Sequence, residues 1–217
     1  MKLKILLSSV ALGSLLTASA VAAPIVFDFS PAPPPGAFGT SQVFTSGAYS
    51  LTAYGFITAT GAATNLYHKY TVGDPAETGL GIAADGDHEI PPQYFVQLDV
   101  QNLIDAGFST LTFKLGSLQA GEEANIFGDT TLGTFGDGSL LSTLTGAPLE
   151  QTISLALTSR YFNITGGGGS GADPVLESAW VNSVPDSGAT VLLLGAALLV
   201  VAAIRNRRIR RTAKSVV

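Results

Sequence analysis

The sequence predicts an all-β domain, an antiparallel β-sandwich of jelly-roll-like type, with an N-terminal signal peptide and a C-terminal single transmembrane helix. Three observations predict the sandwich. Short runs of alternating or β-branched residues recur through the middle of the chain, clusters of Gly, Asp, Asn and Pro separate them, and no long amphipathic helix is visible. Two sheets packed face to face would bury the alternating apolar sides of such strands.

The expected strands are spaced by roughly 8–12 residues, as in sandwiches and barrels. They cover Ile25–Phe29, Tyr49–Ile57, Asn65–Val72, Tyr94–Leu98, Thr110–Leu115, Ala124–Phe127, Ile153–Thr158, Tyr161–Ile164 and Val175–Val181.

Three further local features are predicted. One helical turn is expected at Val100–Ala106, with Asp99 capping its start and Gly107 its end. The proline-rich stretch Ser30–Gly39 is expected to be a stiff, irregular loop. His68 lies in a strand pattern and is expected on the strand surface.

The chain divides into three segments. Residues 1–23 are expected to be a signal peptide, 24–183 one extracytoplasmic domain, and 184–217 a tail. The first segment has a short basic start, an apolar run from Ile5 to Leu16, and small residues for a signal peptidase at Ala20, Ala22 and Ala23. The alternative, a retained N-terminal anchor, is disfavoured because the apolar run is short.

The tail has three parts in a fixed order. The motif Val184-Pro185-Asp186-Ser187-Gly188 is followed by an apolar run over 189–204, and then by the arginine-rich segment 205–217. The arginines predict that this last segment stays in the cytoplasm and that the domain lies outside. Taken alone, the run predicts a permanently anchored single-pass membrane protein.

This order of motif, apolar run and basic end resembles the PEP-CTERM class of sorting tails of Gram-negative bacteria, in its VPDSG-CTERM variant. The resemblance implies that an exosortase recognises the five motif residues, cleaves the tail near them, and releases or transfers the protein. Export machinery and a signal peptidase are then implied partners. The expected locations are an inner-membrane-tethered precursor and afterwards the cell surface or extracellular matrix.

Charge and composition exclude several function classes for the middle domain. Residues 24–183 contain 15 acidic and three basic residues, a net charge near −12, so binding of nucleic acid through charge is excluded. The chain has no cysteine, which excludes disulfides and thiol catalysis.

Acidic residues are densest between positions 74 and 89, where three interpretations are open. Hard cations prefer carboxylate oxygens on loops, so the first is a calcium site built from Asp74, Glu77, Asp85, Asp87 and Glu89. The second is glycoside hydrolysis by Glu77 and Glu89 as paired carboxylates. The third, which we favour, is charged loops that keep the domain soluble, without a cofactor.

The sequence therefore predicts a non-enzymatic surface or extracellular-matrix protein with a structural or binding role, associated with extracellular polysaccharide. The alternatives are a secreted carbohydrate-active hydrolase and a permanently anchored membrane protein.

Overall fold

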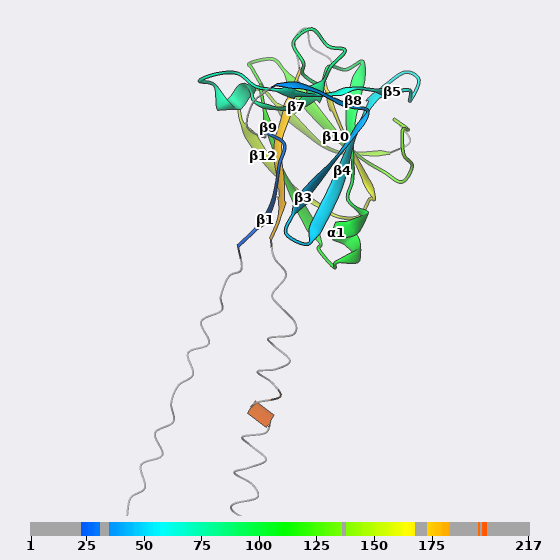
Figure 1. Ribbon diagram of the computed structural model, residues 1–217, viewed down its shortest axis with the longest axis vertical. Coiled ribbons are helices and arrows are strands. Elements are labelled where there is room, and N and C mark those ends of the chain that lie inside the picture. The colour runs from blue at the N-terminus through cyan, green and yellow to red at the C-terminus, as the bar shows by residue number, and fades with distance from the viewer. Residues whose placement is uncertain are drawn as a thin grey trace, which may run out of the picture.

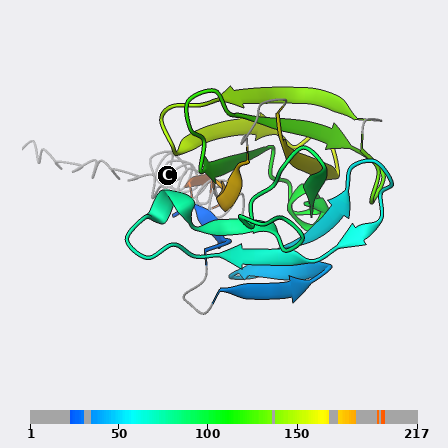
Figure 2. The same ribbon diagram turned by 90° about the horizontal axis from the view of Figure 1, so that it is seen from above.

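The computed structural model describes residues 23–30, 35–135, 138–167, 173–182, 195 and 197–198. Within these ranges the chain forms two seven-stranded antiparallel sheets packed face to face, which confirms the predicted all-β sandwich (Figures 1 and 2). Among the described residues, none of the helices has the length and apolar character needed to cross a membrane.

The first sheet carries the strands that frame the site described below. Its order is β12 (Gln151–Ala156), β9 (Thr110–Gly116), β14 (Val175–Val181), β7 (Gly79–Ile82), β6 (Leu66–Lys69) and β2 (Gly36–Gly39), and β1 (Ile25–Asp28) also pairs with β14.

The second sheet has the order β11 (Ser139–Thr145), β10 (Glu123–Asp129), β13 (Tyr161–Gly166), β8 (Tyr94–Asp99), β4 (Tyr49–Ile57) and β3 (Ser41–Ser46). The short β5 (Ala63–Thr64) pairs with β4.

The last eight strands pair in a nested way. β7 pairs with β14, β8 with β13, β9 with β12 and β10 with β11, and consecutive pairs alternate between the two sheets. The chain therefore crosses to the opposite sheet after each strand of this set, except between β10 and β11, which are neighbours in the same sheet.

Aromatic and aliphatic side chains fill the space between the sheets. Phe113 of β9 and Phe162 of β13 meet across the two layers with ring centroids 5.5 Å apart, and both are fully buried. Phe29 packs edge-on against Phe44 of β3 at 4.6 Å. Each such ring contributes about 2–3 kcal/mol by leaving water, and these contacts tie the two sheets together.

The elements differ from the prediction where glycine or proline obscures the pattern. The proline-rich stretch contains a strand, β2, which pairs with β6. Strands β3, β7 and β11 were not predicted, because their sequences carry glycine, serine and threonine at positions where a strand pattern needs large apolar residues. The predicted helical turn is α1 (Gln101–Asp105), but its N-cap residue is Val100 rather than Asp99, although Asp99 Oδ1 accepts the N–H of Gln101 at 3.0 Å.

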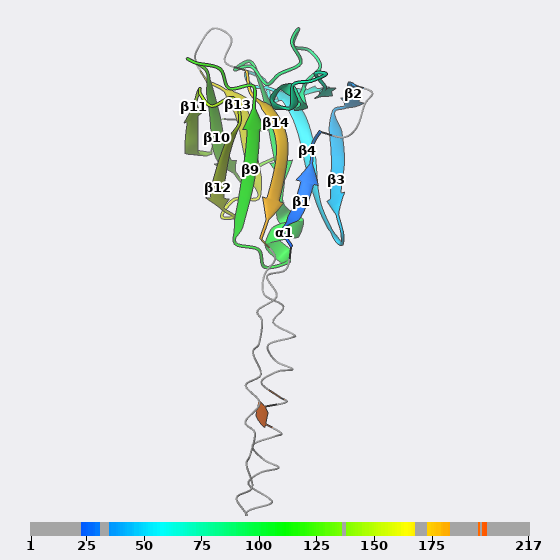
Figure 3. The ribbon, with the colours of Figure 1, turned by 90° about the vertical axis from the view of Figure 1, so that its left-hand side faces the viewer.

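The two ends of the sandwich carry different elements. The beginning of β1, the end of β14 and α1 lie at one end (Figures 1 and 3). The short helix η1 (Pro75–Glu77) lies at the opposite end, on a loop seen from above in Figure 2. Side chains around η1 form the two clefts described next.

Candidate functional site

An acidic cavity of about 450 Å³ opens beside η1. Its lining includes Glu77, Glu89 and Lys69, together with Asp87, Glu122 and Asp173 from neighbouring loops. Five carboxylates thus face a single ammonium group.

Glu77 and Glu89 share both of their hydrogen-bond donors. The ammonium of Lys69 lies 2.7 Å from Glu77 Oε2 and also pairs with Glu89 Oε1. The hydroxyl of Ser117 donates to Glu77 Oε1 at 2.9 Å and to Glu89 Oε1 at 2.7 Å. We call these four residues the glutamate pair and its donors.

Four different local structures bring these side chains together. Lys69 ends β6 and Glu77 ends η1, whose first turn is capped by Asp74 through the N–H of Ala76 at 3.2 Å. Glu89 closes a turn in which the carboxylate of Asp85 accepts its backbone N–H at 3.2 Å. Ser117 follows β9 with a φ of 60°, in the left-handed region.

The two carboxyl groups of the pair have opposite pKa shifts. Burial raises the pKa of Glu89 to about 7, with a further push from the charge of Glu77, against the hydrogen bonds from Lys69 and Ser117. Burial also acts to raise the pKa of Glu77, but the hydrogen bonds from the same two donors outweigh it and leave that pKa below its ordinary value. Burial and nearby carboxylates raise the pKa of Asp173 to about 6.

This arrangement is that of a compensated ion-pair cluster. Lys69 is held by both carboxylates, which raise its pKa above the ordinary value although burial acts to lower it. Its side chain is only 15% exposed, and those of Glu77 and Glu89 are 19% and 12% exposed. Removal of Lys69 would therefore leave two poorly solvated carboxyl groups without their common cation.

The five calcium candidates do not assemble into one site. Glu77, Glu89 and Asp87 line the acidic cavity, while Asp85 accepts the backbone N–H groups of Asp87 and Glu89 within its own turn. Asp74 lines a different cleft. Within the described part of the chain, no group of three or more His, Asp or Glu side chains is arranged to hold a metal ion.

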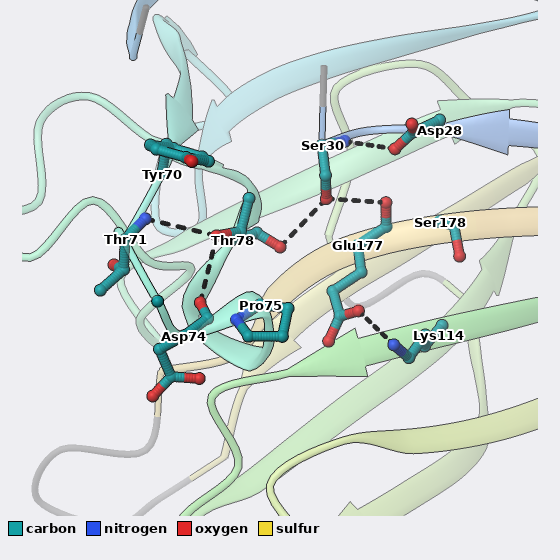
Figure 4. Close-up of a pocket in the computed structure, with 11 residues that line it drawn as sticks. Asp28, Ser30, Tyr70, Thr71, Asp74, Pro75, Thr78, Lys114, Glu177 and Ser178 are labelled. Carbon is teal, nitrogen blue, oxygen red and sulfur yellow. Dashed lines mark hydrogen bonds and ion pairs between the residues drawn. The ribbon is translucent and has the colours of Figure 1, made fainter. Parts of the chain in front are cut away.

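A second cleft, of about 430 Å³, also borders η1, at Pro75 (Figure 4). Tyr70 and Asp74 border it from the η1 loop, Asp28 and Ser30 from the end of β1, and Glu177 from β14. We call it the Tyr70 cleft. Tyr70 is 37% exposed, and an aromatic ring offers a flat apolar surface.

Glu177 and Lys114 form the charged part of this cleft. Lys114 Nζ lies 2.6 Å from Glu177 Oε2 and 2.9 Å from Glu150 Oε2. Glu177 is 6% exposed, and its second oxygen, Oε1, has no hydrogen-bond partner among the described residues. Burial raises the pKa of Glu177, and the pairing with Lys114 opposes that shift.

Nothing in the sequence marks Ser117, Lys114 or Glu177 as members of these sites. Each lies on or next to a strand of the first sheet, far along the chain from the acidic stretch at 74–89. A charged residue inside an otherwise apolar strand, such as Lys114 or Glu177, needs a partner, but the sequence does not say which partner or at which site.

The prediction for His68 was wrong. His68 is 1% exposed and lies in β6, where Leu66 shares its inward face while Tyr67 and Lys69 point outward. Its ring stacks against Phe38 of β2, with centroids 6.0 Å apart. His88, by contrast, lies in a turn, where its backbone N–H donates to the carbonyl of Asp85, and its ring stacks on Tyr67 with centroids 3.7 Å apart.

Most residues of the two terminal signals lie outside the described residues. This holds for Ala20, Ala22 and the motif 184–188, whereas Ala23 is described and exposed. Of the predicted membrane segment 189–204, the structure describes Gly195, Ala197 and Leu198, which are helical.

Comparison with known proteins assigns the tail. Residues 183–208 match the VPDSG-CTERM motif, so the chain carries this sorting motif at its C-terminus. No curated protein matches the chain.

Among solved structures, one similar fold is a mutant of CBM29-2, a family 29 carbohydrate-binding module. It is 10% identical, the match covers 74% of this chain and 86% of that chain, and the TM-score is 0.28. At this score the likeness carries no argument about function.

Proposed function

We propose that the chain is the precursor of an exported, non-enzymatic surface or extracellular-matrix protein whose β-sandwich binds polysaccharide. Its N-terminal residues 1–23 act as a signal peptide, and segment 189–204 holds the precursor in the inner membrane until an exosortase cleaves near Val184–Gly188. The observation that carries this proposal is the VPDSG-CTERM motif at 183–208.

The arrangement of the sandwich supports this route. β1 begins and β14 ends at the same end of the domain, where Ile25 pairs with Val181. Both proposed processing segments therefore adjoin one end, and η1, whose residues Pro75 and Glu77 line the two clefts, lies at the other (Figures 1 and 3). A precursor tethered through 189–204 would present its clefts away from the membrane. We interpret the nested strand pairing as jelly-roll connectivity.

The route is tested by expressing the full chain in an exosortase-bearing host and in the same host without the exosortase gene. We expect the domain in the surface or extracellular fraction of the first host and in the inner-membrane fraction of the second. A variant that lacks residues 184–217 is the control, because it should leave the membrane in both hosts. Identical distributions of the full chain in the two hosts would contradict the proposal.

A hydrolase with Glu77 and Glu89 as paired carboxylates is the second candidate. The observation in its favour is the opposite shift of the two pKa values, which is typical of acid and base pairs. Against it, both carboxylates are bound by the same ammonium and the same hydroxyl, whereas glycosidases hold their two acids on either side of the sugar. We therefore expect no release of reducing sugar from polysaccharide, and release that is lost in Glu89→Gln would establish the hydrolase.

A further inference from the structure

The Tyr70 cleft has hydrogen-bond acceptors to spare and few free donors. Asp28 and Asp74 each commit one carboxylate oxygen to a backbone N–H, from Ser30 at 2.8 Å and Ala76 at 3.2 Å. Their second oxygens have no partner in the described part of the chain. Glu177 Oε1 is likewise unpartnered among the described residues, but it is closed to solvent beside the backbone of Gly116, so Glu177 acts on the cleft only through its charge.

Most of the hydrogen-bond donors that line the cleft are already bound to acceptors of the protein. The Ser30 hydroxyl donates to the carbonyl oxygens of Thr78 and Glu177 at 3.1 and 3.3 Å, and the Thr78 hydroxyl donates to the carbonyl of Asp74 (Figure 4). The Lys114 ammonium is shared by Glu150 and Glu177. Only the hydroxyls of Tyr70 and Ser178 remain among the lining side chains.

The charge of the whole domain also disfavours an anionic ligand. It contains three cationic side chains, and each is engaged: Lys69 by Glu77 and Glu89, Lys114 by Glu150 and Glu177, and Arg160 by Asp99 at 2.7 Å. An anionic polymer would find no free cation on the described surface, and a domain with a net charge near −12 would repel it.

We infer that the Tyr70 cleft binds an amine-bearing sugar, whose ammonium group donates to the spare carboxylate oxygens of Asp28 and Asp74 and whose ring stacks against Tyr70. An ammonium group supplies three hydrogen-bond donors and no acceptor. Free donors are what the lining of this cleft lacks. Its charge also compensates the half-paired carboxylate of Glu177 at the cleft wall, and an exposed aromatic ring attracts both a cation and the apolar face of a sugar. This inference rests on the proposed polysaccharide-binding function and names its ligand class.

The test compares two probes of equal length, a tetramer of glucosamine and a tetramer of N-acetylglucosamine. Acetylation removes the charge and two donors and adds a carbonyl acceptor. We would titrate both into the full chain in detergent by calorimetry, in mildly acidic buffer where sugar amines are protonated. We expect the glucosamine tetramer to bind at least about tenfold more tightly, since hydrogen bonds to charged groups are the stronger ones, and its affinity to fall with added salt.

Three variants locate the binding. Asp74→Asn keeps the acceptor that caps η1 but removes the charge, and should weaken the glucosamine tetramer about tenfold. Tyr70→Ala should weaken it comparably. Asp105→Asn is the matched control, because Asp105 is exposed in α1 at the opposite end of the sandwich and its loss changes the net charge by the same amount.

The outcomes separate this inference from the proposal on which it rests. Equal or tighter binding of the acetylated tetramer would overturn the amine-bearing ligand and leave polysaccharide binding in place. Loss of affinity in Asp105→Asn as large as in Asp74→Asn would overturn the cleft as the site. Binding of neither tetramer, together with no retention on the host's own matrix polysaccharide, would overturn both.

Discussion

Ile25 and Val181 lie opposite each other in adjacent antiparallel strands, so the first and last strands of the sandwich start and finish side by side. The predicted signal-peptidase residues Ala20, Ala22 and Ala23 immediately precede β1, and the matched sorting motif begins at residue 183, immediately after β14. Both proposed cleavage sites therefore adjoin the same end of the folded domain. The fold would not have to open for the proposed removal of either segment.

Stability should fall as the pH rises from 5 to 8. The folded-state pKa of Glu89 is about 7 and that of Asp173 about 6, both above their ordinary values of 4.5 and 3.8. Groups with raised acid pKa values hold protons more tightly when folded, so their stabilisation is complete below the unfolded pKa and is lost as the pH passes the folded pKa. Glu77 acts in the opposite sense, but only below its ordinary value of 4.5.

The variant Glu89→Gln should remove most of this pH dependence. The amide cannot ionise, so at pH 8 the variant should be more stable than the wild type by about 1–2 kcal/mol, less than an isolated shift would give because water reaches the open cavity. Thermal unfolding across the pH range measures it. A wild-type melting temperature that rises from pH 5 to 8 would show that Glu89 has no such raised pKa.

Lys69→Met should be strongly destabilising at pH 8 and less so at pH 5. The change leaves Glu77 and Glu89 facing each other without their common cation, at a cost of about 3–5 kcal/mol for a buried pair. At pH 5 Glu89 is protonated, so much of the repulsion disappears. Urea unfolding at both pH values measures the difference, with Arg160→Met as the control.

Arg160 suits this comparison because its ion pair with Asp99 is at the surface, with the arginine side chain 47% exposed. Its loss should have a much smaller effect that does not change between the two pH values. If Lys69→Met were no more costly than Arg160→Met, the cluster would not be held together by this ion pair.

Sequence patterns were sufficient for the parts of the fold in which local and tertiary preferences agree. β4, β8 and β9 have alternating or β-branched residues and were predicted nearly to their ends. β7 was missed because its sequence Gly-Leu-Gly-Ile has few side chains to form a pattern, although all four residues are buried. Its position depends on β6 and β14, which pair with it from different parts of the chain.

The candidate site, like the fold, could be predicted from the sequence only in part. Glu77 and Glu89 were considered together as a pair from their closeness in sequence, and the structure does bring them together. The donors that compensate them could not be predicted, because Ser117 reaches the pair from the end of β9 in a left-handed conformation. The spacing of carboxylates along the chain suggested calcium ligation, but the local turn around Asp85 uses that carboxylate for backbone N–H groups.

Gly81→Ala should destabilise the domain and disturb the acidic cavity. A Cβ at position 81 would collide with the backbone carbonyl oxygen of His88, so the turn that carries Glu89 would have to move away from β7. We expect a loss of about 1–3 kcal/mol, the usual cost of overpacking. Chemical denaturation measures it.

Gly36→Ala is the matched control, since Gly36 also lies in a strand of the first sheet and a Cβ there meets nothing within 4 Å. That variant should stay within about 0.5 kcal/mol of the wild type. Equal effects of the two substitutions would mean that the close approach of His88 to β7 is not what the glycine at 81 permits.

The central claim is that the C-terminal motif is a cleavage signal rather than part of a permanent anchor. Intact-mass measurement of the protein recovered from an exosortase-bearing host tests it most directly. The account predicts a mass that lacks residues 1–22 or 1–23 at the N-terminus and the whole segment 205–217 at the C-terminus, with the new C-terminus close to Val184–Gly188. A protein that retains Arg205–Val217 while the exosortase is active would contradict it.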